Sequence, residues 1–319
     1  MNARAAILAF ALVCSGQLAH AEDAMTDCSR PTGLDVSYRD ANGDLVADLP
    51  DDASKWRDPP TLVWAYAPIE DPAVYAELFK PFTQHLAACL GRQIVYYPVE
   101  SSSAEVDAMR SGRLHFAGFS TGSTVAAVNQ AGAVPFAAKA VGSEMRSYRL
   151  VALVRAGSPY KSIADLVGKR VAHATPISNS GNYAPRALFP QEGLVPDVDY
   201  IPIMTGGHDR SILGLLSGDY DMAAVASDVL ERMQERGLVS PDDVREIYKS
   251  QPFPTSSFAH AHDLDPVLAR TLQACFYNFE FPPRLQEEFN GDTNFAPINY
   301  QKDWATVRAV REQVGAEME

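Results

Sequence analysis

The chain has 319 residues, of which 46% are hydrophobic and 21% are charged, and its formal net charge is −13 at pH 7. This composition is typical of a soluble globular protein with one large domain or two ordinary ones. The acidic balance argues against a nucleic-acid-binding protein, which would carry a basic stripe, so no nucleic acid is expected as a partner.

The first 21 residues resemble a cleavable export signal. Arg4 supplies a positive start, Ala5 to Val13 an apolar core, and Ala19 to Ala21 a small-x-small cleavage site. We therefore expect cleavage before Glu22 and a periplasmic protein. No later apolar run reaches the roughly 18 residues of a membrane-spanning helix.

Residues 22–60 are rich in Asp, Pro and Gly and are expected to form an extended surface segment. From residue 61 onward, strand-like and helix-like segments alternate, which predicts an α/β fold. The predicted strands are 61–67, 92–99, 114–120, 148–156, 170–174, 199–204 and 221–227, and the predicted helices are 74–91, 103–112, 162–169, a segment from about 180, and 209–218.

Two pairs of segments suggest an internal repeat. "VWAYAP" (63–68) resembles "VAHATP" (171–176), and "MRSGRLHFAG" (109–118) resembles "LLSGDYDMAA" (215–224) in the same order. The matches predict two similar α/β lobes, although chance similarity between buried strands is an alternative, because such strands are all apolar runs. Two facing lobes would enclose a cleft at the carboxyl ends of their strands.

Three strand-to-helix turns combine glycine with hydroxyl, amide or imidazole side chains. Their polar residues are Ser120 and Thr121, then Ser178, Asn179 and Ser180, and finally His208. A helix start has unpaired N–H groups and a partial positive charge, so such turns can hold a small anion. The alternatives are an ordinary capped helix facing water and a solvated loop histidine. Three such turns in one chain favour an anion site.

Five segments between residues 62 and 277 carry a family resemblance. They are "AYAPIEDPAVY", "AMRSGRLHFAGFSTGS", "TPISNSGNYAPRALFP", "GGHDRSILGLLSGDYDMAAVAS" and "YKSQPFP". In order and spacing they resemble the substrate-binding proteins of phosphonate, phosphite and phosphate ABC importers.

The resemblance implies a type II periplasmic-binding fold, in which two lobes joined by two crossing strands close on the ligand. On this basis we expect lobe 1 at 61–144 and 256–319 and lobe 2 at 145–255, with crossings near 141–148 and 249–256. The implied partners are a small phosphorus oxyanion and the permease of an ABC transporter. We expect a monomer with no cofactor and no metal.

The resemblance also implies roles for single residues. Ser178, Asn179 and Ser180 would grip the phosphoryl oxygens at the helix start, although relatives commonly have threonine at the central position. His208 matches a histidine that contacts the phosphonate. Asp228 stands where an aminoethylphosphonate binder places an acidic residue against the ligand's ammonium group; it could instead accept a hydrogen bond from a protonated oxyanion.

Other positions of that pocket differ. Ser102 corresponds to a pocket tyrosine, Ser256 to a second acidic residue, and Phe119 to a pocket aromatic residue but without a phenolic hydroxyl. Tyr66, in the first segment quoted above, is also expected at the ligand. These differences argue against aminoethylphosphonate and leave a smaller oxyanion or another phosphonate.

The sequence also contains two candidate metal sites and leaves two other functions as alternatives. His260 and His262 could ligate a metal from one strand face, but no third ligand is near and a surface histidine pair is favoured. The segment from Asp40 to Asp52 has acidic residues at the spacing of an EF-hand calcium loop. Its glycine, however, is at position 4 instead of 6, and position 12 is not Glu, so a solvated acidic loop is the alternative to calcium.

"SNSGN" is not the nucleophile elbow of a hydrolase. An organophosphorus hydrolase or lyase therefore remains only as an alternative function, as does a ligand sensor.

Cys28, Cys89 and Cys275 remain after cleavage. One disulfide is possible in an oxidising compartment, but the sequence leaves its pairing open, and buried thiols are the alternative. The C-terminal stretch from 284 is expected to return to lobe 1. Its residues Trp304, Val307, Val310 and Val314 have the spacing of one buried helical face.

Overall fold

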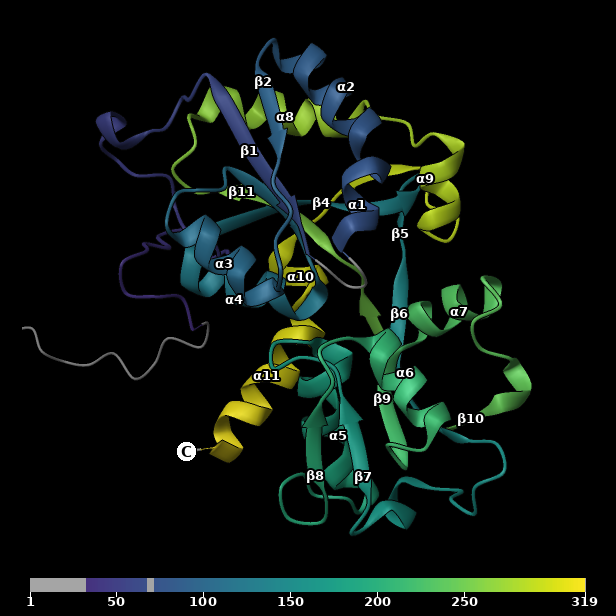
Figure 1. The fold of residues 1–319 in the computed structure, drawn as a ribbon. Helices are drawn as coiled ribbons and strands as arrows, with labels where there is room; N and C mark the ends of the chain where they lie inside the picture. The colour runs from purple at the N-terminus through teal and green to yellow at the C-terminus, as the bar shows by residue number, and fades with distance from the viewer. Residues whose placement is uncertain (1–32, 68–71, 319) are drawn as a thin grey trace, which may run out of the picture. The chain divides into compact units, whose positions relative to one another are not determined.

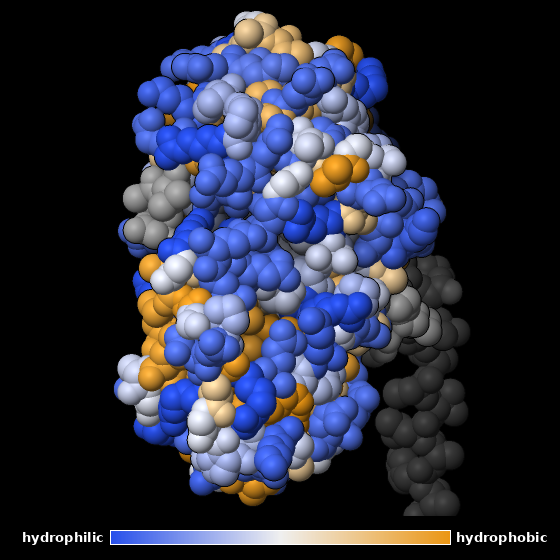
Figure 2. Space-filling model, turned by 90° about the vertical axis from the view of Figure 1, so that its right-hand side faces the viewer, coloured by the Kyte–Doolittle hydropathy of each residue, from blue (hydrophilic) through white to orange (hydrophobic). Residues whose placement is uncertain are grey.

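The computed structural model describes residues 33–67 and 72–318 (Figure 1). The predicted signal segment and Cys28 lie outside these ranges. Within them, no helix combines the length and apolar character needed to span a membrane. Figure 2 shows one face of the molecule, which is largely hydrophilic, with hydrophobic side chains gathered in its lower half.

Two β-sheets carry the fold, one in each lobe. The first has the order β12-β4-β11-β3-β1-β2 with β5 paired to β4, and the second has the order β10-β6-β9-β7-β8. The strands of the first sheet are β1 (Thr61–Tyr66), β2 (Gln93–Tyr96), β3 (Phe116–Phe119), β4 (Ala133–Val141), β5 (Glu144–Met145), β11 (Ser257–Ala261) and β12 (Asn294–Pro297). Those of the second are β6 (Ser147–Arg155), β7 (Arg170–His173), β8 (Ile201–Met204), β9 (Met222–Ala226) and β10 (Val244–Pro254).

Helices cover these sheets (Figure 1). The α-helices are α1 (Pro72–Leu78), α2 (Lys80–Leu90), α3 (Ser102–Arg110), α4 (Thr121–Ala131), α5 (Ala184–Leu188), α6 (His208–Ser217), α7 (Ser227–Glu235), α8 (Pro266–Tyr277), α9 (Pro283–Glu288), α10 (Tyr300–Asp303) and α11 (Ala305–Met318). Short 3-10 turns occur at η1 (Ala53–Lys55), η2 (Ile163–Leu166), η4 (Phe189–Glu192) and η5 (Pro241–Asp243), and η3 (Asn179–Tyr183) is a π-helical turn.

The strand pairing confirms the internal repeat. In the first sheet β1 is parallel to β2 and β3, and β11 is antiparallel to β3. In the second sheet β7 is parallel to β8 and β9, and β6 is antiparallel to β9. The matched segments at 63–66 and 171–173 lie on β1 and β7, the equivalent strands.

The chain passes from one sheet to the other between β5 and β6 and returns between β10 and β11. Both points fall inside the stretches predicted as crossings. The exact lobe boundaries at residues 144/145 and 255/256 stay a prediction.

The single helix predicted at 74–91 is two helices, α1 and α2, which meet at Phe79. The cause is Pro81, because a proline has no N–H to donate to the carbonyl one turn earlier and its ring crowds that turn. The predicted end is confirmed: Gly91 follows α2 with φ of 62°, a left-handed conformation that glycine adopts without strain.

The acidic segment at 40–52 is held by hydrogen bonds within the chain. The Asp40 carboxylate accepts the backbone N–H groups of Gly43, Asp44 and Leu45, while Arg39 pairs with Asp48 and Asp51. No cluster of three or more His, Cys, Asp or Glu suited to a metal occurs in the described ranges. The loop's carboxylates accept hydrogen bonds from its own backbone and from Arg39, and the choice between a solvated acidic loop and a calcium loop stays a prediction.

His260 is buried, contrary to the expectation of a surface histidine pair, whereas His262 is partly exposed. His260 is 7% exposed, and its Nε2 lies 3.2 Å from Gln273 Nε2. The ring of His262 packs edge-on against Tyr38. Burial lowers the pKa of both histidines, which keeps them neutral. They belong to the packing between β11, α8 and the N-terminal segment.

The C-terminal helix α11 departs from the prediction that this stretch returns to lobe 1. β12 does pack against β4 of the first lobe, but α11 contacts both α5 of the second lobe and α4 of the first. Trp304, Val307, Val310 and Val314 are all buried, which confirms the predicted helical face. This apolar face is long enough to cover α5 while Trp304 stays against α4, where its indole N–H donates to the Thr121 carbonyl at 3.1 Å.

A disulfide joins Cys89 in α2 to Cys275 in α8. It resolves the pairing that the sequence left open. The alternative of two buried free thiols is wrong for these residues. The bond ties two helices that are 186 residues apart in sequence and cover the same face of the first sheet.

Candidate functional site

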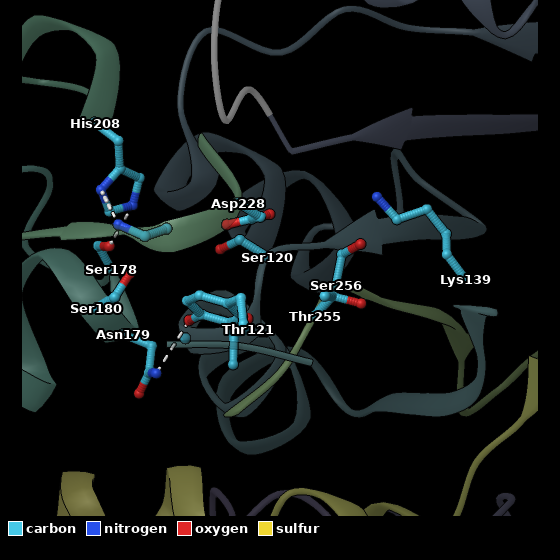
Figure 3. Close-up of a pocket in the computed structure, with 13 residues that line it drawn as sticks. Ser120, Thr121, Lys139, Ser178, Asn179, Ser180, His208, Asp228, Thr255 and Ser256 are labelled. Carbon is cyan, nitrogen blue, oxygen red and sulfur yellow. Dashed lines mark hydrogen bonds between the residues drawn. The ribbon is translucent and has the colours of Figure 1, made fainter. Parts of the chain in front are cut away.

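A small cavity lies where polar strand-to-helix turns of the two sheets meet (Figure 3). Its volume is about 50 Å³. One water needs roughly 10–15 Å³ by the same measure, so the space is several times what one water needs. The cavity is lined by Ser120, Thr121, Gly122, Lys139, Tyr148, Ser178, Asn179, Ser180, His208, Ala226, Asp228, Thr255 and Ser256.

The structure brings most of the predicted site residues to this cavity. Ser102 instead lines an adjoining cavity of about 40 Å³, which shares Ser120, Ser178 and His208 with the first. Tyr66 lies behind the cavity wall, where its hydroxyl contacts Ser256 at 3.3 Å.

Phe119 does not line either cavity, which corrects the expectation that its ring faces the ligand. Its side chain is fully buried in a cluster with Ala65, Val106 and Ala126. It lies there because β3 is an inner strand of the first sheet, between β1 and β11, and both of its faces are covered.

The helix predicted to start at about residue 180 begins at Asn179. Residues Asn179–Tyr183 form the π-helical turn η3, and α5 continues it. Ser178 caps this helix, since its Oγ accepts the backbone N–H of Gly181 at 3.0 Å. The first N–H groups of a helix have no partner inside it, so those of Asn179 and Ser180 remain for another acceptor.

His208 is the first residue of α6 and lies against the same helix start. The backbone N–H of Ala226 donates to its Nδ1 at 3.3 Å. An Nδ1 that accepts a hydrogen bond carries no proton, so the imidazole proton is on Nε2. Nε2 lies 3.3 Å from Ser178 Oγ. Because Ser178 Oγ already accepts from Gly181 and can accept from His208, its own O–H is left to donate elsewhere.

The start of α4 forms the other side of the cavity. Ser120 caps this helix, and its Oγ lies 2.8 Å from that of Ser123. Thr121 Oγ1 donates to the Pro254 carbonyl at 2.9 Å, which anchors α4 to the end of β10. The starts of α4 and η3 therefore lie on opposite sides of one small space.

Gly122 permits this close approach. A Cβ at this position would lie 2.7 Å from the backbone nitrogen of Asn179 and would overlap the Ile177 carbonyl. We therefore expect Gly122→Ala to push the two helix starts apart and weaken oxyanion binding about tenfold or more, since overpacking against backbone typically costs about 1–3 kcal/mol. Titration calorimetry checks this. Gly157→Ala, where an added Cβ meets nothing within 4 Å, should bind like the wild type. Equal affinity in both variants would contradict the prediction.

Several polar atoms around the cavity have no hydrogen-bond partner among the described residues. They are Asn179 Oδ1, Asp228 Oδ1 and Thr255 Oγ1. Asp228 Oδ2 contacts Arg232 at 3.3 Å, and Asn179 Nδ2 donates to Tyr148 OH at 3.1 Å. Buried polar groups are usually paired, so unpaired atoms at a cavity indicate that it is built for a polar ligand.

Lys139 is a cavity residue that the sequence analysis does not predict. It lies on β4 and is 7% exposed, and its Nζ donates to Tyr66 OH at 3.0 Å. The available signal was a single lysine inside the apolar segment "AVPFAAKAV", because lysine is almost never buried without a special partner.

His173, at the end of β7, contacts Asn182 of the η3 turn and so helps to fix the position of this helix start. Its Nδ1 lies 3.0 Å from Asn182 Oδ1 and its Nε2 3.0 Å from Tyr200 OH. The Asn182 side-chain amide donates to the Pro176 carbonyl, which fixes its oxygen toward His173. His173 Nδ1 therefore donates and Nε2 accepts, so the neutral ring is fully satisfied.

Burial lowers the pKa of His173 to about 4. A lowered pKa means that the folded state favours the neutral ring, so stability is complete above the unfolded value near 6.5 and is lost as the pH falls toward 4. We expect about 3 kcal/mol of unfolding free energy to be lost through this residue. Chemical denaturation at pH values between 8 and 4 should show that the free energy of unfolding falls less in His173→Gln than in the wild type. Parallel curves for the two proteins would contradict the prediction.

A family model matches residues 64–304, and its description is a periplasmic substrate-binding protein of a phosphonate ABC transporter. The "Phosphate-import protein PhnD" of Mycolicibacterium smegmatis is 26% identical over 261 residues, which cover 78% of this chain and 81% of the relative. The "Phosphonates-binding periplasmic protein" of Escherichia coli is 21% identical over 207 residues, which cover 64% of this chain and 61% of the relative.

Solved structures show the same fold. PhnD1 from Prochlorococcus marinus, in complex with methylphosphonate, matches with a TM-score of 0.71 at 19% identity and covers 82% of this chain and 99% of its own. The alkanesulfonate-binding protein SsuA from Xanthomonas axonopodis, bound to MOPS, matches with a TM-score of 0.56 at 16% identity and covers 82% and 94%. The fold is thus the predicted type II periplasmic-binding fold. With the family model matching most of its length, the chain belongs to the periplasmic substrate-binding proteins of phosphonate ABC transporters.

Proposed function

We propose that this protein binds a phosphorus oxyanion (a phosphonate, phosphite or phosphate) in the cavity between the lobes and delivers it to the permease of an ABC importer. One observation carries the proposal. The Ser178 hydroxyl, His208 Nε2 and the first N–H groups of the η3 helix converge on a cavity of a size that suits such an ion. Each hydrogen bond to a charged oxygen would contribute about 1.5–3 kcal/mol.

Asp228 supports an oxyanion that still carries a proton. Its Oδ1 is buried without a partner among the described residues, and a carboxylate can only accept hydrogen bonds. A monoprotonated phosphate, phosphite or phosphonate offers an O–H to this oxygen. Sulfate and sulfonates have no proton at neutral pH and would be repelled, so we propose that the site discriminates against them.

The geometry of the Ser178–His208 pair argues against the hydrolase alternative. A general base must have a free nitrogen toward the serine hydroxyl. Here Nδ1 accepts from Ala226 N–H, so Nε2 carries the proton and faces Ser178 as a donor. The pair thus suits binding of an anion better than activation of a nucleophile.

We further propose that the protein is exported by cleavage before Glu22 and acts as a monomer in the periplasm. The relatives are transport proteins of that compartment by family. A sensor on the same fold is the alternative role. Loss of oxyanion uptake on deletion of the gene would support the importer, whereas unchanged uptake would favour the sensor.

Calorimetric titration of the mature chain tests the binding function. The probes are phosphite, phosphate, methylphosphonate and 2-aminoethylphosphonate, with sulfate as the control. We expect tight binding of at least one of the first three and none of sulfate. Phosphorus NMR of the same samples should show the ligand chemically unchanged, and turnover would support the enzyme alternative. Absence of binding by every phosphorus probe would refute the proposal.

A further inference from the structure

Lys139 is a buried cation whose presence at the cavity is not explained by the binding of an oxyanion at the η3 helix start. It lines the cavity, is 7% exposed and lies on a strand whose other side chains are apolar. Moving an ammonium group out of water is unfavourable unless an opposite charge or good hydrogen bonds compensate.

The protein itself supplies little compensation. None of the ion pairs within 33–67 and 72–318 involves Lys139, whose Nζ donates to Tyr66 OH and lies 3.8 Å from the centroid of the Phe289 ring. A hydroxyl and a ring face stabilise a cation but bring no negative charge. An ammonium group has three N–H donors, so Lys139 retains donor capacity and a full charge for a group inside the cavity.

The neighbours of Lys139 form a second polar end of the cavity. Tyr66 OH contacts both Lys139 Nζ and Ser256 Oγ, and Thr255 Oγ1 is a buried hydroxyl without a partner among the described residues. In Figure 3 this end lies across the cavity from His208 and Ser178, with Asp228 between the two. A ligand held at the helix start would therefore direct its other end toward Lys139.

Asp228 does not cancel this positive charge. It is the carboxylate among the described lining residues, and it makes its ion pair with Arg232 of its own helix and not with Lys139. The Lys139 end thus presents to the cavity one cation and the hydroxyls of Thr255 and Ser256, which suits an anionic oxygen and opposes an ammonium group.

We propose that Lys139 determines the ligand class: it favours compounds whose substituent on phosphorus carries an anionic oxygen, such as a carboxylate, and disfavours those whose substituent carries an ammonium group. This inference rests on the proposed function. It gives a role to the serine at position 256, because a carboxylate there would pair with Lys139 and remove the selectivity.

Three phosphonates with small substituents of different charge test the inference: phosphonoformate, ethylphosphonate and aminomethylphosphonate. We expect the wild type to bind phosphonoformate at least tenfold more tightly than aminomethylphosphonate, with ethylphosphonate between them. Lys139→Met keeps the apolar stem beside Phe289 but removes the charge. It should weaken phosphonoformate about tenfold relative to ethylphosphonate and reduce or reverse the preference over aminomethylphosphonate. The exposed Lys302→Met is the matched control and should keep the wild-type ratios.

Two results would overturn the inference. One is a Lys139→Met variant, folded by its melting curve, with wild-type ratios among the probes. The other needs no variant: a wild type that binds aminomethylphosphonate as tightly as phosphonoformate. Ser178-dependent binding of phosphate or ethylphosphonate keeps the proposed function standing in either case. Failure of every probe to bind would overturn both.

Discussion

Replacing Ser178 and His208 together by alanine should lower the affinity for the bound oxyanion by a factor of about 10 to 10⁴. The double variant removes the Ser178 O–H and the single His208 Nε2–H, which donates either to Ser178 Oγ or to the charged oxygen. One or two hydrogen bonds to a charged oxygen are therefore lost, each contributing about 1.5–3 kcal/mol, and every 1.4 kcal/mol is a tenfold change. Calorimetric titration with the tightest wild-type ligand measures the loss.

The single variants sharpen this test. Ser178 Oγ and His208 Nε2 contact each other, so their effects should not add, and a double-mutant cycle should give a coupling of about 0.5–3 kcal/mol. Ser217→Ala removes an exposed hydroxyl that contacts Asp219 and serves as the control. Wild-type affinity in the double variant, with its fold intact by circular dichroism, would show that the anion is bound elsewhere.

Removing the Cys89–Cys275 disulfide should cost about 2–5 kcal/mol of unfolding free energy. The bond closes a loop of 186 residues, and in the chain-entropy description a longer loop gives a larger restriction of the unfolded state. Urea denaturation of Cys89→Ser, Cys275→Ser and the double variant measures the effect. All three should lose similar stability, because either single change breaks the same bond. A double variant as stable as the oxidised wild type would contradict the prediction.

Much of the fold was predictable because its signals are local. Buried parallel strands appear as apolar runs, and helix starts carry their own capping residues, so the turn at Ser178 and its helix could be located within one or two residues. The break at Phe79 was also encoded locally, by Pro81, but the apolar periodicity on both sides concealed it.

The less predictable features depend on contacts between distant segments. Lys139 could not be assigned to the cavity because nothing near it in sequence indicates that β4 ends beside Tyr66 and Ser256. Likewise, Phe119 has the residue type of a pocket aromatic, but only the position of β3 inside the sheet shows that its ring faces the core. The path of α11 between two lobes is likewise absent from its own periodicity, which shows one buried face but not which surfaces cover it.

The position of α11 limits how the protein can move. Two crossing segments alone would let the lobes both bend and twist about their connection. α11 adds a third link between the lobes. Trp304, directly before this helix, donates a hydrogen bond to the start of α4, and α11 itself packs against α5. A body held at three points keeps fewer degrees of freedom than one held at two, so opening should approximate a rotation about a single axis that passes near this helix. Because of this constraint, the starts of α4 and η3 would reach the same relative position each time the cleft closes.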